Sequence, residues 1–155
     1  MSRLFVTDKE KRFFDSITKE LIQKIICQKV IYYAISDEHT NTHRLYDESI
    51  RKTTFRPVEV NALVLFDDPI QNVGEFSIDT VWHIEVYFNV EELKERNLIA
   101  REGDFLKFGD ITYEIEKLTQ PQIVYGQIEK SVMIKSVCRS SRKGQFEVLD
   151  NLPGY

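Results

Sequence analysis

The chain has 155 residues, of which 42% are hydrophobic, 12% aromatic and 30% charged. This size and composition are typical of a globular domain and exclude a chain that is disordered throughout. The formal net charge of −4 argues against a dedicated nucleic-acid-binding protein, because such proteins are usually basic.

The apolar runs are too short to span a bilayer, and the N-terminus lacks the apolar stretch of a signal peptide. We therefore expect a single domain over residues 1–155 that is kept in a reducing cytoplasm. The two cysteines, Cys27 and Cys138, are too few for a disulfide framework.

The first predicted element is a helix over residues 8–27. Thr7 and Glu10 have the spacing of a capping box, in which two side chains and two backbone N–H groups at a helix start satisfy one another. Four apolar residues then follow at helical spacing: Phe14, Ile17, Leu21 and Ile25. We expect these four to pack against the sheet of the same domain.

Several strands are predicted after this helix. Residues 29–36 are rich in β-branched and aromatic side chains, which favours a strand, although they could instead extend the helix. Residues 58–66 and 81–88 are also predicted strands. The alternation in 81–88 places four side chains on one face, of which we expect Trp82 or its neighbours in the core: Trp82, Ile84, Val86 and Phe88.

A short helix and a hairpin follow. Asn89 can cap a helix over 90–97, and Gly109-Asp110 predicts a tight turn between strands at 104–108 and 111–118. A last strand is predicted at 131–138. Together these elements predict an α+β domain, with an N-terminal helix packed on a small, mostly antiparallel β-barrel or sandwich. The β-rich core then spans residues 28–138.

Residues 37–56 form a long polar segment without a clear period, which we expect as a loop. Such segments are uncommon in small domains and are usually functional or disordered. Its few apolar side chains favour ordering against a partner surface: Leu45, Tyr46, Ile50 and Phe55. The alternative is a loop folded back on its own barrel.

Histidines are the residues in this chain that could carry chemistry. His39 and His43 could share a metal only on a helix, and the intervening Thr40-Asn41-Thr42 favours a solvated loop instead. His83 and Glu85 lie two apart on a predicted strand, which is more typical of a polar sheet face than of an acid–base pair. No nucleophile, phosphate-loop or Cys-x-x-Cys motif is present, so we expect no enzyme activity, cofactor or bound metal.

The tail over residues 139–155 is polar and begins with a small basic cluster: Arg139, Arg142 and Lys143. Such a cluster can contact the phosphates of DNA or face a partner. A solvated, salt-bridging surface is the simpler interpretation.

Three stretches resemble neck proteins of contractile-tailed bacteriophages. The stretch 30–49 begins with a tyrosine-rich segment, continues through an acidic turn and contains Leu45-Tyr46-Asp47-Glu48. These four residues are similar to a Leu-Tyr-Gly-Glu-like motif of that family, with Asp in place of Gly. Residues 55–64 resemble the strand that follows the motif. Residues 103–115 are similar to the Gly-Asp…Gly…Tyr-Glu-Val pattern of phage head–tail adaptor barrels. The resemblance covers about residues 28–138.

The resemblance implies a non-enzymatic virion protein that is assembled in the host cytoplasm. Such proteins form a ring, here expected to be six-fold, between the portal and the tail. They help to close the head, retain packaged DNA and dock the tail. The expected partners are further copies of the chain, the portal or adaptor protein, tail proteins and, non-specifically, packaged DNA, with no membrane partner.

The resemblance also marks a candidate interface within 37–56. We expect contacts to an adjacent subunit or ring from six residues, with the first two as apolar anchors: Leu45, Tyr46, Asp47, Glu48, Ile50 and Phe55. One alternative function is a baseplate or tail-terminus structural protein. Another is a barrel that binds single-stranded nucleic acid through aromatic side chains: Tyr32, Tyr33, Tyr87, Tyr113 and Tyr125.

Overall fold

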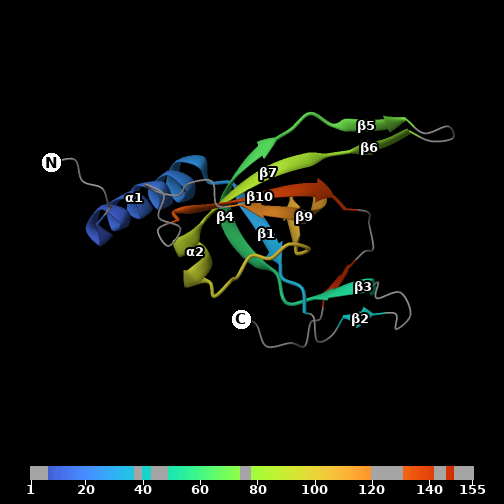
Figure 1. Ribbon diagram of the computed structural model, residues 1–155, viewed down its shortest axis with the longest axis horizontal. Helices are drawn as coiled ribbons and strands as arrows, with labels where there is room; N and C mark the ends of the chain where they lie inside the picture. Colours follow the sequence, from blue (N-terminus) through green and yellow to red (C-terminus); the bar gives the residue numbers. More distant parts are fainter. Residues whose placement is uncertain are drawn as a thin grey trace.

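The computed structural model describes residues 7–36, 40–42, 49–73, 78–119, 131–141 and 146–148. At its centre is a closed six-stranded antiparallel β-barrel with the strand order β1-β4-β7-β10-β9-β8 (Figure 1). The barrel strands are β1 (Lys29–Tyr33), β4 (Val58–Phe66), β7 (His83–Asn89), β8 (Phe105–Phe108), β9 (Ile111–Thr119) and β10 (Met133–Ser140).

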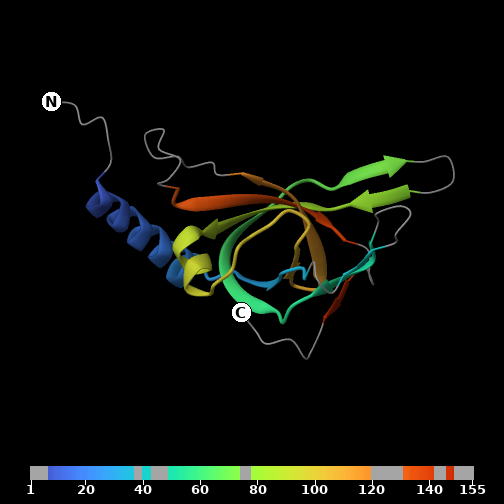
Figure 2. The same ribbon diagram turned by 60° about the horizontal axis from the view of Figure 1, so that its bottom comes forward.

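Two elements project from opposite sides of the barrel, as Figures 1 and 2 both show. On one side, α1 (Asp8–Glu20) continues as a π-helical segment, η1 (Leu21–Ile26). On the other side, β5 (Ile70–Val73) and β6 (Ile78–Val81) form an antiparallel hairpin. Among the described residues, no helix is long and apolar enough to cross a membrane.

The barrel interior follows the period of two that strand geometry imposes. Val60, Ala62 and Val64 point inward from β4, and Ile84, Val86 and Phe88 point inward from β7. The rings of Tyr32 and Phe88 meet edge to face, with centroids 6.1 Å apart. The predicted α+β barrel is therefore confirmed, and so is the core position of Ile84 and Val86, whereas Trp82 is 42% exposed at the barrel edge.

The structure also confirms the predicted short helix and hairpin. The Asn89 side chain accepts hydrogen bonds from the first N–H groups of α2 (Val90–Glu95), and Leu93 and Leu98 are buried beside it. Gly109 has a φ of +62° in the turn between β8 and β9, a conformation that glycine adopts at little cost. The sequence signals for capping and turns therefore correspond to the observed element ends.

The predicted helix is present, but its predicted packing is wrong. Thr7 and Glu10 form the expected capping box. However, the four predicted core residues are all exposed: Phe14, Ile17, Leu21 and Ile25. The helix contacts its own domain along its other side: α1 lies against α2 and β7, and η1 lies against β4. The side of the helix that carries these four residues therefore faces away from its own domain.

The segment 37–56 is more regular than a long loop where it is described. It contains β2 (Asn41–Thr42) and β3 (Ser49–Thr54), and β3 also pairs in parallel with β11 (Phe146–Val148) from the C-terminal tail. β3 therefore lies between β2 and β11. These pairings could not be inferred from the sequence, because β2 and β11 are only two and three residues long.

Candidate interaction surfaces

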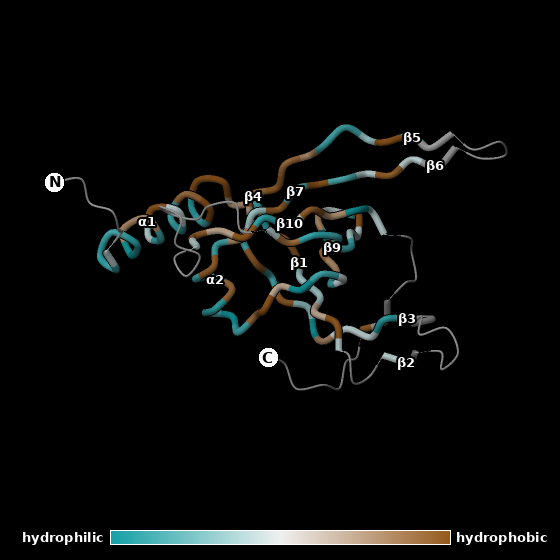
Figure 3. Tube along the Cα trace, in the orientation of Figure 1, coloured by the Kyte–Doolittle hydropathy of each residue, from teal (hydrophilic) through white to brown (hydrophobic). Residues whose placement is uncertain are grey.

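An exposed apolar surface runs along α1 and η1, and we call it the α1 stripe. Its five members are 45% to 72% exposed: Phe13, Phe14, Ile17, Leu21 and Ile25. Figure 3 shows apolar residues along this projection, away from the barrel. Single exposed apolar residues are ordinary on a protein surface, but a contiguous group of them is typical of an interaction site.

Two cations border the α1 stripe at its N-terminal end. Lys9 lies one helical turn before Phe13, and Arg12 immediately precedes Phe13. Both cations are exposed, and neither forms an ion pair with any residue in the described part of the chain. Glu10 also lies within one turn of Phe13 and Phe14, but its carboxylate accepts the Thr7 N–H and hydroxyl, and Glu20 pairs with Lys24. The unpaired charges beside the stripe are therefore positive.

The opposite, inward face of α1 carries polar groups. Asp15 is 2% exposed, and its Oδ1 has no hydrogen-bond partner among the described residues. Burial, and next the Glu91 carboxylate of α2, raise the pKa of Asp15 above its usual value. Lys19 donates to Glu95 of α2 at 2.5 Å. A helix whose only partner is its own domain normally turns its apolar side inward, so this polarity indicates a second partner.

One apolar residue anchors the helix to the barrel. Ile22 is 1% exposed and packs with Val132 and Met133 on the outside of the barrel, flanked by Ile26 and Tyr87. With about 3.6 residues per turn, Ile22 lies on the same side of the helix as Asp15 and on a different side from the α1 stripe. The helix is therefore held along this side while its stripe stays uncovered.

A second exposed apolar surface, the arm patch, lies where β4 leaves the barrel towards β5. Its members are Phe66, Ile70 and Trp82, whereas Leu65, which is also exposed, lies on the other face of β4 by the alternation of the strand. The register places Trp82 opposite this connection, because Ile70 pairs with Val81 and Phe66 pairs with Ile84. The Phe66 ring also lies against the partly buried Phe108 ring, with centroids 5.8 Å apart.

The arm patch has an acidic rim. Asp67 and Asp68 are exposed, and neither forms an ion pair with any residue that the structure describes. The sequence from Leu65 to Trp82 contains four acidic residues and no lysine or arginine. This absence of cations is a sequence signal for the patch that our sequence analysis missed.

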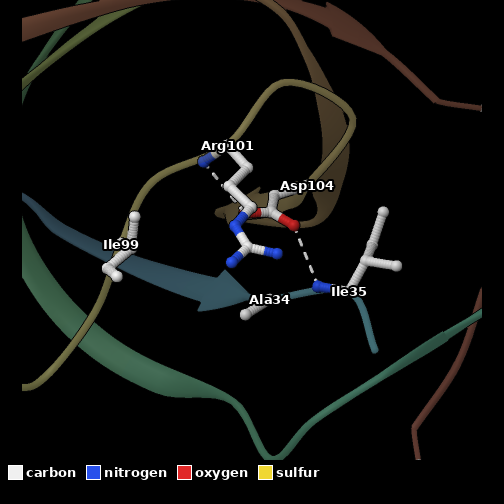
Figure 4. Close-up of a pocket in the computed structure, with 5 residues that line it drawn as sticks. All are labelled: Ala34, Ile35, Ile99, Arg101 and Asp104. Atoms are coloured by element: carbon white, nitrogen blue, oxygen red, sulfur yellow. Dashed lines mark hydrogen bonds between the residues drawn. The ribbon is translucent and has the colours of Figure 1, made fainter. Parts of the chain in front are cut away.

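A small pocket lies between the end of β1 and the loop before β8. Figure 4 shows its lining residues: Ala34, Ile35, Ile99, Arg101 and Asp104. The Asp104 carboxylate accepts the Tyr32 hydroxyl, the Ile35 N–H at 2.9 Å and the Arg101 N–H at 3.2 Å. Three donors therefore converge on one buried carboxylate.

This arrangement connects two parts of the barrel. Burial raises the pKa of Asp104, although the Tyr32 hydroxyl and the backbone donors oppose that rise. Gly103, with a φ of +92°, turns the chain so that Asp104 points back to β1. The carboxylate is occupied by donors of its own chain, and it ties β1 to the loop before β8. We call this arrangement the Tyr32–Asp104 lock.

A lysine holds the strand β3 against the barrel. Lys52 donates to Glu114 of β9 at 2.5 Å, and its ammonium lies 5.2 Å from the centre of the Phe105 ring. Close by, the Phe55 N–H donates to the Ala34 carbonyl at 2.9 Å. The end of the segment 37–56 is therefore already attached to the barrel within one chain.

Of the six predicted interface residues, the structure describes only two, Ile50 and Phe55. The motif residues Leu45, Tyr46, Asp47 and Glu48 lie outside the described residues, as do His39 and His43. Ile50 lies in β3. Phe55 packs against the barrel core of its own chain, so it is not a free apolar anchor.

The predicted basic cluster is described at one position only. Arg139 is exposed on β10 and lies 3.8 Å from Glu116 of β9. Arg142 and Lys143 lie outside the described residues. The structure therefore brings Arg139 next to a carboxylate, as a salt-bridging surface would.

Of the predicted pair on β7, Glu85 is engaged within the chain, whereas the buried His83 Nδ1 has no hydrogen-bond partner among the described residues. Glu85 accepts Lys135 at 2.5 Å and the Tyr87 hydroxyl at 3.0 Å, so it is not paired with His83. Of the aromatic residues considered for base stacking, Tyr32 and Tyr113 are buried in the barrel core. Buried rings cannot stack on a nucleic-acid base, which weakens the nucleic-acid hypothesis.

Comparison with protein-family models finds no match to this chain, and comparison with curated proteins finds none either.

Proposed function

We propose that this chain is a structural subunit of the neck of a contractile-tailed bacteriophage. In this proposal identical copies form a ring between the portal and the tail, where they help to close the head and dock the tail. The observation that carries the proposal is the pair of apolar surfaces, the α1 stripe and the arm patch, on projections at opposite sides of one barrel.

Two further features support a role in assembly. The barrel closes on itself through six strands and leaves no open sheet edge, so it offers a stiff unit for a ring. The resemblance to neck and adaptor proteins covers about residues 28–138, which is the stretch that contains the barrel. The projection α1 lies outside that stretch and supplies a contact surface of its own.

The finer parts of the proposal concern symmetry and neighbours. We expect a six-fold ring, with the portal or adaptor protein on one side and tail proteins on the other. The net charge of −4 suits a ring around a DNA channel, because an acidic lining does not hold DNA in place. A baseplate or tail-terminus position would use the same two surfaces, and the experiment below separates these positions.

The test removes the protein from the particle. In a phage that encodes this chain, we expect a null mutant to give lysates of separate heads and complete tails, and wild-type protein added in trans to restore joined particles. Electron microscopy with a labelled antibody would then place the protein at the head–tail junction. Joined, infectious particles in the null mutant, or label at the baseplate or on no part of the particle, would contradict the proposal.

A further inference from the structure

We propose that the α1 stripe of one copy packs on the arm patch of the next copy, in a head-to-tail contact between identical chains. The inference rests on the proposed ring, because it names the two surfaces that would join neighbouring subunits. It commits to a second copy of this chain as the partner of both surfaces.

The positions of the two surfaces favour a contact between molecules. The projection that carries the α1 stripe and the hairpin next to the arm patch extend from opposite sides of the barrel (Figures 1 and 2). One chain therefore cannot cover its own stripe with its own patch. Contact between two different surfaces of identical chains is heterologous, and it closes into a ring when the rotation between neighbours allows.

The unpaired charges beside the two surfaces are complementary. Lys9 and Arg12 border the α1 stripe, and Asp67 and Asp68 border the arm patch. All four are exposed and form no ion pair with the described residues of their own chain. An apolar centre with a charged rim is the usual anatomy of a protein interface, and opposite charges on the two rims increase the rate and specificity of association.

The same charges disfavour the two symmetric alternatives. Two arm patches facing each other would bring Asp67 and Asp68 of both copies together, and two stripes would each present Lys9 and Arg12. Like charges facing each other in an interface cost free energy, so they act against those pairings. The charge pattern therefore selects stripe against patch.

The experiment measures which surfaces meet when the purified chain associates. Cys27 is replaced by Ser in every variant, because Cys27 is exposed whereas Cys138 is buried. One variant then carries Ile17→Cys in the stripe, and a second carries Ile70→Cys in the patch. Ile99→Cys is the matched control, because Ile99 is also an exposed isoleucine but belongs to neither surface. A short bis-maleimide links cysteines that come close, without requiring disulfide geometry.

We expect the Ile17→Cys and Ile70→Cys variants, when mixed, to give several-fold more linked dimer than either variant mixed with Ile99→Cys. A chain that carries both cysteines should give linked species larger than a dimer. Predominant self-linking of Ile17→Cys or of Ile70→Cys would overturn the proposal in favour of a symmetric pair. A yield equal to that of the Ile99→Cys control would also overturn it.

Charge reversal supplies a second readout that does not depend on the cysteine positions. Lys9→Glu with Arg12→Glu on the stripe chain, or Asp67→Lys with Asp68→Lys on the patch chain, should each lower the yield several-fold. Combining the two reversed chains should restore it, and failure to restore it would contradict the pairing. Failure of the proposed neck position is seen separately, by electron microscopy of the particle.

Discussion

In the barrel, alternate residues of β4 and β7 face a closed interior, and their apolar side chains are almost fully removed from water. On α1 the apolar residues face outward, while Asp15 and Lys19 face the domain. The first region contains the contacts that stabilise a single chain, and the second exposes surface that a single chain cannot cover. Hydrophobic patterning in the sequence therefore does not show whether an element packs on its own domain or on another molecule.

The barrel should show the largest effect of a single substitution. Phe88→Ala removes a ring that lies in the core against Tyr32, and it should lower the free energy of unfolding by about 3–5 kcal/mol. Phe14→Ala is the matched variant on α1, and it should cost less than about 1 kcal/mol because the ring is already half exposed. Urea unfolding of both variants checks this, and equal losses would remove the distinction between the two regions.

The Tyr32–Asp104 lock should give the next largest effect. Asp104→Ala leaves the Tyr32 hydroxyl and the Ile35 N–H without their acceptor, and it removes one of the two acceptors of the Arg101 N–H, which also donates to the Tyr32 oxygen at 3.3 Å. Each unsatisfied buried donor costs about 1–3 kcal/mol, so we expect a loss of about 2–4 kcal/mol after partial hydration of the pocket. Asp110→Ala, in the exposed turn after β8, is the control. A loss in Asp104→Ala no greater than in the control would show that the lock does not stabilise the barrel.

The helix contains its own comparison between an anchor and the stripe. Ile22→Ala removes the fully buried side chain of this anchor and should cost about 2 kcal/mol. Ile25→Ala, three residues on, should change the free energy of unfolding by no more than about 0.5 kcal/mol in the isolated chain. The measurement is denaturant unfolding followed by helical circular dichroism. A large cost for Ile25→Ala would place the stripe in contact with its own domain.

The smallest predicted effect depends on pH. Because burial and Glu91 raise the pKa of Asp15 in the folded chain, the unfolded chain releases this proton first as the pH rises. Protonated Asp15 therefore adds stability to the folded chain below its unfolded pKa of about 3.9, and this contribution is lost as the pH rises through the pKa of Asp15 in the folded chain. Asp15→Asn should therefore be more stable than the wild type at neutral pH, with the difference shrinking in acid. Unfolding curves at several pH values test this, and a variant that is less stable at neutral pH would contradict it.

Local signals in the sequence predicted much of the barrel. The capping box at Thr7, the Asn89 cap and the Gly109 turn each depend on a few neighbouring residues, and all three are observed. The alternation in β7 likewise placed Ile84 and Val86 in the core. These features need no knowledge of distant parts of the chain, which is why they could be predicted.

The features that were missed depend on distant contacts. The apolar stripe of α1 resembles a core-facing helix in sequence, and only the tertiary arrangement leaves it uncovered. The pairing of β3 with β11 joins segments about ninety residues apart, and neither segment is distinctive alone. The arm patch gave one usable signal, its acidic residues without any cation, but its exposure follows from where β4 leaves the barrel.

In the proposed assembly α1 and the β5–β6 hairpin are contact elements, whereas the barrel is complete without a partner. Amide hydrogen exchange, measured on the isolated chain and on the assembled particle, tests it most directly. We predict that assembly slows exchange in α1, η1, the hairpin and the end of β4 that carries the arm patch, whereas exchange in the rest of the six barrel strands stays the same. Unchanged exchange in α1 and the hairpin, or protection gained mainly in the barrel strands, would contradict the account.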